Sequence, residues 1–266
     1  MRALGICRAG SDTSRRLIEP FQVGETPTFI SHIQAGLQNL ASDDNRFLVL
    51  SGGDTKRNKT TISEARSYRN LALANNLFGH PASLASRILT DDNATDSFQN
   101  VVFPLVVFAS HATQCQTAEK LTDQNTRRPR TVPDHLTVIG HEFKRRRFEE
   151  LHLAAVRWPK DPARFRYVGI DPPMDLKKRI EVFEGETRRG YGAWQKDLYG
   201  TGEVLASKRT GRGWTADKKK EIETTVRRAW QHSAFKDDIL AFLNWDGGAS
   251  GEELYPGKLP WNGLDD

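Results

Sequence analysis

Apolar and polar residues alternate between residues 26 and 170 in two kinds of pattern. Four stretches carry apolar residues every three or four positions, which is typical of a helix with one buried face, and four short runs are rich in β-prone residues. The predicted helices are 26–40, 63–77, 97–108 and 143–156, and the predicted strands are 47–50, 87–89, 136–139 and 166–170. Because strands alternate with helices, we expect an α/β fold with a mostly parallel sheet covered on both faces.

Two features interrupt this pattern. Pro104 lies inside the third predicted helix, where its ring and its missing N–H should kink or shorten that helix. Residues 114–134 are largely polar and include three closely spaced arginines, so we expect a loop or an insertion there.

The pattern changes after Pro173. Residues 184–205 hold five glycines, and five of the six tryptophans lie after residue 190. We therefore expect an α/β domain over residues 17–173 and a helical or irregular C-terminal extension over residues 174–266. Helices are predicted near 218–230 and 235–243 in this extension, with aromatic side chains that pack on the α/β domain.

Composition excludes several classes of protein. The chain has 266 residues, of which 37% are hydrophobic and 27% charged, and its longest apolar run falls well short of the ~20 residues that cross a bilayer. The two cysteines, Cys7 and Cys115, cannot build a disulfide framework, and the first residues do not form a signal peptide. We expect a protein without a membrane span in a reducing, cytoplasmic compartment.

The chain is mildly basic, with a net charge of +5 and basic runs at 127–130, 144–147 and 218–220. Such a charge suits an anionic small molecule as well as it suits nucleic acid. Few aromatic residues interleave with the basic runs, and no nucleic-acid-binding motif is present. We therefore rank a small ligand above nucleic acid.

Three polar clusters each follow a predicted strand, at residues 51–55, 91–97 and 140–147. Ligands of open parallel sheets bind outside the carboxyl ends of the strands, so the clusters predict one shared site. Ser51-Gly52-Gly53 forms either a plain tight turn or a backbone that approaches an anion closely. Lys144 and Arg147, three residues apart at the start of a helix, share a face that favours a carboxylate or a phosphate.

The candidate catalytic residues are Asp91, Asp96 and His141. The acids, together with Asp92, could bind a divalent metal, hold ribose hydroxyls, act as a general base or simply cap a helix. His141 could be a general acid or base, although a histidine in a loop is more commonly only hydrogen-bonded. No zinc-ligand spacing and no serine nucleophile elbow is present.

Several short motifs in a fixed order carry a family resemblance. They are Glu19-Pro-Phe-Gln22, Gly24-Glu-Thr-Pro-Thr-Phe29, Leu50-Ser-Gly-Gly53, Ser63-Glu-Ala65, Ala94-Thr-Asp-Ser-Phe-Gln-Asn100, His141-Glu-Phe-Lys144 with Arg147, and Gly190-Tyr-Gly192. From about Leu17 to Trp214 the chain resembles the domain-of-unknown-function family 218, the YdcF/SanA-like proteins, and in particular the fungal branch. The resemblance implies a Rossmann-like three-layer sandwich, and it implies S-adenosylmethionine as a candidate ligand, since some bacterial relatives bind it.

The resemblance also implies site residues. The positions that match the family's motifs are Gly52, Gly53, Glu64, Asp91, Asp96, Ser97, Asn100 and Arg147. This chain departs from the bacterial pattern: Asp91 stands where those relatives have Glu, Asp96-Ser97 where they have Asn-Thr, and Lys144 where they have His. Residues 1–16 do not show the family's opening strand, so we expect a first strand that is missing or divergent. Either the start of the sequence is truncated or mis-spliced, or the protein lacks part of the family's site.

Three functions fit these residues. The first is binding of an anionic or nucleoside-containing small molecule, with the reaction, if any, undefined. The second is metal-assisted phosphoester hydrolysis, in which Asp54, Asp91 or Asp96 would hold a divalent ion and Arg147 would stabilise developing charge. The third is a basic module that binds nucleic acid or a scaffold.

Overall fold

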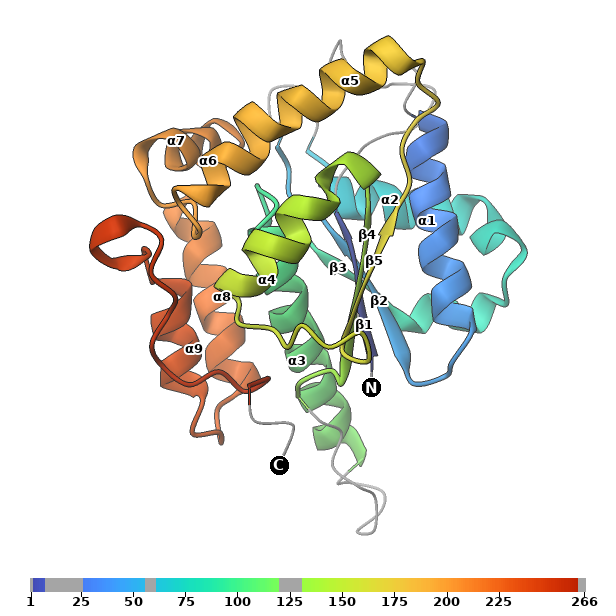
Figure 1. Ribbon diagram of the computed structural model, residues 1–266. Helices are drawn as coiled ribbons and strands as arrows, with labels where there is room; N and C mark the ends of the chain where they lie inside the picture. The colour runs from blue at the N-terminus through green and yellow to red at the C-terminus, as the bar shows by residue number, and fades with distance from the viewer. Residues whose placement is uncertain (1, 8–25, 56–60, 120–130, 263–266) are drawn as a thin grey trace.

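A parallel five-stranded sheet forms the centre of the protein in the computed structural model, which describes residues 2–7, 26–55, 61–119 and 131–262 (Figure 1). The strands are β1 (Arg2–Cys7), β2 (Arg46–Ser51), β3 (Ile88–Asp91), β4 (His135–Gly140) and β5 (Phe165–Gly169). They lie in the order β3-β2-β1-β4-β5. The four strands predicted within 47–170 are all present, so the α/β class and the parallel sheet are confirmed.

The central strand is β1, which the sequence analysis did not find. It pairs in parallel with β2 on one side, where Ile6 lies opposite Leu50, and with β4 on the other, where Ile6 lies opposite Ile139. A first strand is therefore present, which excludes the missing strand and leaves the divergent one of the two expectations, and the sheet extends beyond the expected domain start at residue 17. The segment escaped notice because Arg2–Cys7 carries only two large aliphatic residues and a glycine.

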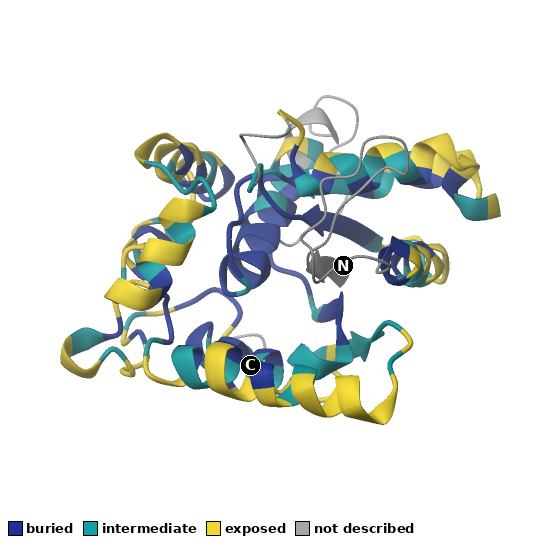
Figure 2. Cartoon of the chain, turned by 90° about the horizontal axis from the view of Figure 1, so that it is seen from above, coloured by how far each residue is buried: buried dark blue, intermediate teal, exposed yellow. Residues whose placement is uncertain are grey.

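Helices cover both faces of the sheet. On one face α1 (Thr26–Ala41) and α2 (Glu64–Ala74) share a buried cluster with Leu48 and Leu50 of β2. On the other face α3 (Gln99–Glu119) and the helical stretch after β4 pack against Leu136 and Val138. Seen from above, buried positions gather around the sheet and α3, while the outer sides of the surrounding helices are exposed (Figure 2).

Pro104 does not shorten α3, which runs for 21 residues. The buried side chains around it, including Val101, Val102 and Leu105, lie in the main core, and their burial offsets the ~3 kcal/mol that an internal proline costs. The helix also occupies the start of the predicted loop at 114–134, up to Glu119. Residues 120–130 of that prediction lie outside the described part of the chain.

The predicted helix at 143–156 is a composite helical stretch. A 3-10 turn, η4 (Glu142–Lys144), is followed by a π-helical segment, η5 (Arg147–His152), and then by α4 (Leu153–Ala155). Two further 3-10 segments, η2 (Asn76–Gly79) and η3 (Ala82–Arg87), connect α2 to β3. The second predicted helix accordingly ends at Ala74, before the predicted residue 77.

The C-terminal segment is mostly helical. It contains α5 (Leu176–Gly185), a second π-helical segment η6 (Glu186–Tyr191), α6 (Gly192–Gln195), α7 (Glu203–Gly211), α8 (Ala216–Ala229), α9 (Lys236–Leu243) and η7 (Gly248–Ser250). The last two long helices match the predicted ones. Aromatic side chains join this segment to the α/β unit: Phe103 stacks on Trp214 with ring centroids 5.6 Å apart, and Phe98 meets Tyr199 at 5.5 Å. Among the helices that the structure describes, none has the length and apolar character needed to cross a membrane.

Candidate functional site

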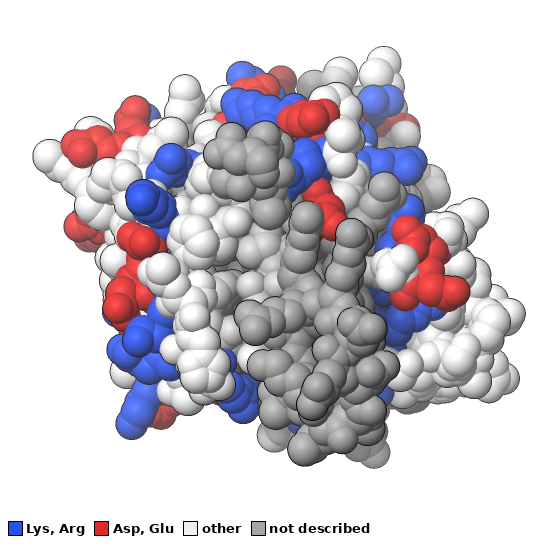
Figure 3. All heavy atoms as spheres, turned by 90° about the horizontal axis from the view of Figure 1, so that it is seen from below, with Lys and Arg blue, Asp and Glu red and all other residues white. Residues whose placement is uncertain are grey.

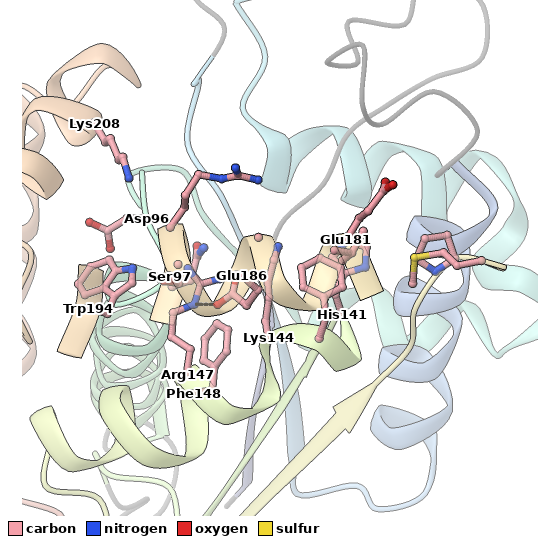
Figure 4. Close-up of a pocket in the computed structure, with 18 of the residues that line it drawn as sticks. Asp96, Ser97, His141, Lys144, Arg147, Phe148, Glu181, Glu186, Trp194 and Lys208 are labelled. Atoms are coloured by element: carbon pink, nitrogen blue, oxygen red, sulfur yellow. Dashed lines mark ion pairs between the residues drawn. The ribbon is translucent and has the colours of Figure 1, made fainter. Parts of the chain in front are cut away.

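A cavity of about 890 Å³ lies beyond the carboxyl ends of the strands. Segments that follow β3, β4 and β5 line one side of it, and α5, η6, α6 and α7 of the C-terminal segment line the other (Figure 4). Sites for small molecules commonly have ~300–1,000 Å³, so this volume suits one small organic ligand.

Positive side chains outnumber negative ones in the cavity wall. Six lysines and arginines line it: Lys144, Arg147, Lys178, Arg189, Lys208 and Arg212. Three acids face them: Asp96, Glu181 and Glu186. The wall therefore carries an excess of positive charge that favours an anion.

Arg147 and Glu186 form an ion pair within this wall. The Arg147 Nε lies 3.1 Å from the Glu186 Oε1, and the two side chains are only 11% and 13% exposed. Burial raises the pKa of the Glu186 carboxyl, an effect that the nearby Arg147 and Lys144 cations oppose. Glu186 Oε1 is buried and has no hydrogen-bond partner among the described residues, so the pair is held by charge with imperfect geometry.

A glycine makes room for the Glu186 carboxylate. A Cβ added to the buried Gly190 would lie closer than 3.0 Å to both carboxylate oxygens of Glu186. This close approach gives a physical reason for glycine in the Gly190-Tyr-Gly192 motif.

Asp96 has its carboxylate engaged on both sides. Its Oδ1 accepts a hydrogen bond from the backbone N–H of Gln99 at 2.9 Å and caps α3, and its Oδ2 pairs with the Nε of Arg209 from α7. Both side chains are largely buried. Asp96 lines the cavity as predicted, but its contacts are those of a helix cap that anchors the C-terminal segment.

Ser97 lies beside Asp96 in the cavity wall and contacts a buried histidine. The Ser97 Oγ is 2.8 Å from His152 Nε2. Burial, with the Arg147 and Arg209 charges, lowers the pKa of His152 well below its usual value, so this ring is neutral near pH 7. The neutral ring holds the Ser97 hydroxyl in place at the N-terminal end of α3.

Asp91 and Ser51 do not line the cavity; they form a buried network with Asn100. The Ser51 Oγ lies 2.6 Å from Asp91 Oδ2 and 2.8 Å from Asn100 Oδ1. Burial raises the pKa of Asp91 to about 6, although hydrogen bonds from Ser51 and from the Asn93 backbone oppose the shift. These contacts join β2, β3 and α3. Of the residues Ser51, Asp91 and Asn100, only Asn100 also lines the cavity.

The sequence allowed either a plain tight turn or an anion-binding backbone at Gly52-Gly53, and the structure shows the plain turn. The N–H of Gly52 donates to Asp91 O at 3.0 Å, and that of Gly53 donates to Ala94 O at 2.7 Å, so neither is directed at a ligand. Gly52 has a φ of 152°, and a Cβ there would lie 2.9 Å from Glu64 Cβ. The glycines allow α2 to approach β2, and the anion cradle expected at this turn is not formed.

Glu64 is directed towards this same loop. Its Oε1 accepts a hydrogen bond from the Thr55 hydroxyl at 2.9 Å, and it does not line the cavity. Asp92, next to Asp91, pairs with Arg66 at 2.9 Å and accepts from Ser63. The structure therefore divides the predicted site: Asp96, Ser97, Asn100, His141, Lys144 and Arg147 meet at the cavity, whereas Ser51, Gly52, Gly53, Glu64 and Asp91 lie outside its wall.

His141 is a buried part of the cavity wall. Its ring stacks on Phe143 with centroids 4.9 Å apart and meets His32 edge-on at 5.0 Å. The Nδ1 of His141 is 3.8 Å from Asp171 Oδ1. Burial lowers the pKa of the neighbouring His32 to about 4, so this side of the cavity is an aromatic wall beside a neutral ring.

The acids considered for a divalent metal do not form one ligand set. Asp54 pairs with Lys218 of α8, Asp96 pairs with Arg209, and Asp91 lies in its own buried network. In the described part of the chain, no three His, Cys, Asp or Glu side chains gather in an arrangement that suits a metal ion.

Sequence analysis missed the part of the wall contributed by the C-terminal segment. These residues include Lys178, Glu181, Glu186, Arg189, Lys208 and Arg212. The glycines at 185 and 190 were the available signal, because a helical glycine often marks a close approach. They did not indicate which side chains the close approach would accommodate.

Comparisons with known proteins identify one distant relative and no activity. No family model matches the chain, and no solved structure matches it. The chain is similar to the uncharacterized protein YOR238W of Saccharomyces cerevisiae, with 23% identity over 73% of this chain and 72% of the yeast protein. The cavity residues are therefore the basis for the proposed function.

Proposed function

We propose that the protein binds a small anionic or nucleoside-containing molecule in the cavity, with S-adenosylmethionine as one candidate. The observation that carries this proposal is the excess of lysine and arginine over acidic side chains in a cavity sized for one small ligand, which favours the anionic ligands of this class. S-adenosylmethionine carries a sulfonium cation, so it is a candidate through the family resemblance and not through the charge of the wall. Lys144, Arg147 and Arg212 are partly buried, and such cations act on an anion more strongly than exposed ones, because water screens them less.

The fold supports the same location. We propose that the α/β unit is a Rossmann-like three-layer sandwich related to the YdcF/SanA-like proteins, as the motifs suggest. In the strand order β3-β2-β1-β4-β5, the chain reverses its direction of winding between β1 and β4. Ligands of open α/β sheets bind at such a reversal, outside the carboxyl ends of the strands, and the segment after β4 contributes His141, Lys144 and Arg147 to the wall.

The two ends of the cavity differ in character. In Figure 4, Lys208, Asp96 and Trp194 lie at one end, His141 and Glu181 at the other, and Lys144, Arg147 and Glu186 between them. The end near β4 and β5 is also walled by Phe143, Pro172 and Pro173. The flat rings of His141 and Phe143 at this end, with the cations Lys144 and Arg147 further in, would suit a ring joined to an anionic group.

The other two functions have less support. Metal-assisted hydrolysis would need Asp54 or Asp96 to leave an ion pair with Lys218 or Arg209. For nucleic acid, the face seen from below carries interspersed acidic and basic side chains in the part that can be described, and no continuous basic track is visible there (Figure 3). A phosphate backbone needs such a track.

Calorimetric titration tests the proposal. The full chain is titrated with S-adenosylmethionine, S-adenosylhomocysteine and adenosine monophosphate, each with and without Mg²⁺. Saturable binding is expected for at least one of them, and Lys144→Ala should weaken it by about tenfold or more, equivalent to ~1.4 kcal/mol. Lys219→Ala is the matched control, because Lys219 is an exposed lysine of α8 outside the cavity wall. The proposal fails if none of the three ligands binds, and Lys144 leaves the site if both variants bind alike.

A further inference from the structure

We infer that the carboxylate of Glu186 occupies the anion site of the cavity, and that the anionic group of the ligand, a dianion of the phosphate type, takes its place between Arg147 and Lys144. This inference rests on the proposed function, because it needs a ligand in the same cavity. It adds the chemical class of the ligand's anionic group and names the residue that competes with it.

Two cations from one helical stretch converge on this carboxylate. Arg147 Nε lies 3.1 Å from Glu186 Oε1, and Lys144 acts on the same carboxyl electrostatically. Figure 4 shows Glu186 directed to the space between Lys144 and Arg147. A site that two cations form around a carboxylate of the protein's own chain also suits an anion from outside the chain.

The carboxylate fits this site imperfectly. Its Oε1 is buried without a hydrogen-bond donor among the described residues, and a buried acceptor left without a donor costs free energy. Burial also raises the pKa of Glu186, which means that the charged form is not well solvated there. An anion with more acceptor oxygens and a second charge would be held better.

Charge balance selects the class of anion. With Glu186 in place, Arg147 and Lys144 carry one positive charge in excess of the carboxylate, and with Glu186 displaced they carry two. A phosphate monoester or inorganic phosphate supplies about two negative charges near pH 7, whereas a simple carboxylate supplies one. The site with Glu186 displaced therefore favours a phosphate-type group over a carboxylate.

The helix that leads into Glu186 is lightly anchored. Within α5, the helix that leads into η6, only Gly185 is buried, and Leu176 and Ile180 are exposed at 75% and 50%. Few buried contacts oppose a small outward shift of this helix, so little packing is lost when the carboxylate leaves.

The test uses inorganic phosphate as the probe and acetate as the single-charge comparison. Both are titrated into the full-length wild-type protein, into Glu186→Gln and into Glu181→Gln. Glu181 is the matched control, since it is a carboxylate in the same cavity wall, and the ion pair shown for Arg147 is with Glu186. Removing either acid raises the charge of the cavity by the same amount, and only Glu186→Gln removes the carboxylate that pairs with Arg147.

We expect Glu186→Gln to bind phosphate at least about tenfold more tightly than the wild type, with a smaller gain for acetate, and Glu181→Gln to gain less than about threefold. Equal gains in the two variants would overturn the inference, because they would reflect the overall charge of the cavity. Unchanged or weaker phosphate binding by Glu186→Gln would overturn it as well. If Glu186→Gln lowers the unfolding temperature, Glu186→Ala provides the same comparison.

The failure of the inference is distinguishable from that of the proposed function. If S-adenosylmethionine or adenosine monophosphate binds but phosphate binds neither the wild type nor any variant, the inference is wrong and the proposed ligand site is supported. If neither the nucleosides nor phosphate bind, both fall.

Discussion

Arg147 and Glu186 are each the first residue of a π-helical segment, and their side chains meet 3.1 Å apart in the cavity wall. A π-helical segment adds a residue to a turn and so changes the direction in which the following side chains point. Such segments are rare and occur frequently at functional sites. Here one π-helical segment begins at Arg147 and the other begins at Glu186. We infer that the altered helix geometry at these two positions helps to direct the two side chains towards each other.

Gly190→Ala tests how closely the backbone of η6 must approach Glu186. Alanine in a helix is normally more stable than glycine by ~1 kcal/mol, but here its Cβ would overlap the Glu186 carboxylate. The atoms in the way are the end of the Glu186 side chain, which can move aside by giving up part of its ion pair with Arg147. We expect the free energy of unfolding to fall by ~1 kcal/mol or less, measured by urea denaturation.

Two comparisons accompany this substitution. Gly211→Ala places a Cβ in open space at the end of α7, so it should be neutral or slightly stabilising. In a protein that already carries Glu186→Ala, no carboxylate overlaps the new Cβ, and Gly190→Ala should then stabilise the protein. A loss of stability that is the same in both backgrounds would show that Glu186 is not what requires the glycine.

Asp91 should make stability depend on pH. Its pKa is raised to about 6 in the folded protein from an ordinary value of 3.8, so between these values the folded state binds more protons than the unfolded state. Stability from this group is therefore present at low pH and is lost as the pH rises towards 6. Asp91→Asn removes the titration while keeping an acceptor for the Asn93 N–H.

The measurement is the urea midpoint of wild type and Asp91→Asn at about pH 4, pH 5 and pH 7. The variant should gain stability relative to wild type as the pH rises. Asp92→Asn is the control, since that acid is more exposed and pairs with Arg66. Parallel curves for wild type and Asp91→Asn would show that Asp91 has the same pKa in the folded and unfolded states.

Much of the sheet could be predicted because its strands are short apolar runs bounded by turn residues. Runs such as 47–50 and 136–139 have no helical period and end at serine or glycine. Arg2–Cys7 has no such signature, and it becomes the central strand through pairing on both sides with β2 and β4. Tertiary pairing overrides weak local preference there.

Part of the candidate site could be predicted for a similar reason. Polar residues at strand ends converge in any parallel sheet, and Ser97, Lys144 and Arg147 accordingly line the cavity together. The sequence could not show that the N–H groups of Gly52 and Gly53 are bound by neighbouring carbonyls. Nor could it show that Glu186, on a helix far along the chain, faces Arg147, because no periodicity encodes how two helices cross.

Arg209 should contribute more to the free energy of unfolding than to ligand binding. Asp96→Asn tests this, because it removes the charge with which Arg209 pairs. Arg209 pairs with Asp96 in a largely buried position, and it also donates to Tyr199 O at 2.6 Å. Asp96→Asn keeps the helix cap, since asparagine caps as well as aspartate, but leaves the guanidinium without its counter-charge. We expect a loss of ~3 kcal/mol in the free energy of unfolding.

Adding Arg209→Met to Asp96→Asn should recover part of that loss, because no buried charge then lacks a partner. Asp237→Asn serves as the exposed control, since Asp237 is 85% exposed in the first turn of α9 and should change stability by less than ~0.5 kcal/mol. If Asp96→Asn leaves stability intact and abolishes ligand binding, Asp96 acts on the ligand directly.

Lys218 and Asp54 form the second ion pair that joins the C-terminal segment to a loop at a strand end. Lys218 projects from α8 to the loop after β2 with 9% of its side chain exposed, and Asp54 is 25% exposed. A Cβ on Gly53 would lie 2.9 Å from the Lys218 Nζ, so the loop and the lysine fit closely. Lys218→Met should cost ~2–3 kcal/mol, below the value for a fully buried pair because Asp54 keeps some contact with water.

A double-mutant cycle with Asp54→Asn isolates the pair, because the second substitution removes the charge that Lys218→Met leaves behind. We expect the double variant to be more stable than the sum of the single effects by ~1 kcal/mol or more. Lys219→Met, one residue along α8 and exposed, should be nearly neutral. Strictly additive single effects would mean that α8 is held to the α/β unit by its apolar contacts with α3, and that the loop after β2 does not depend on the C-terminal segment.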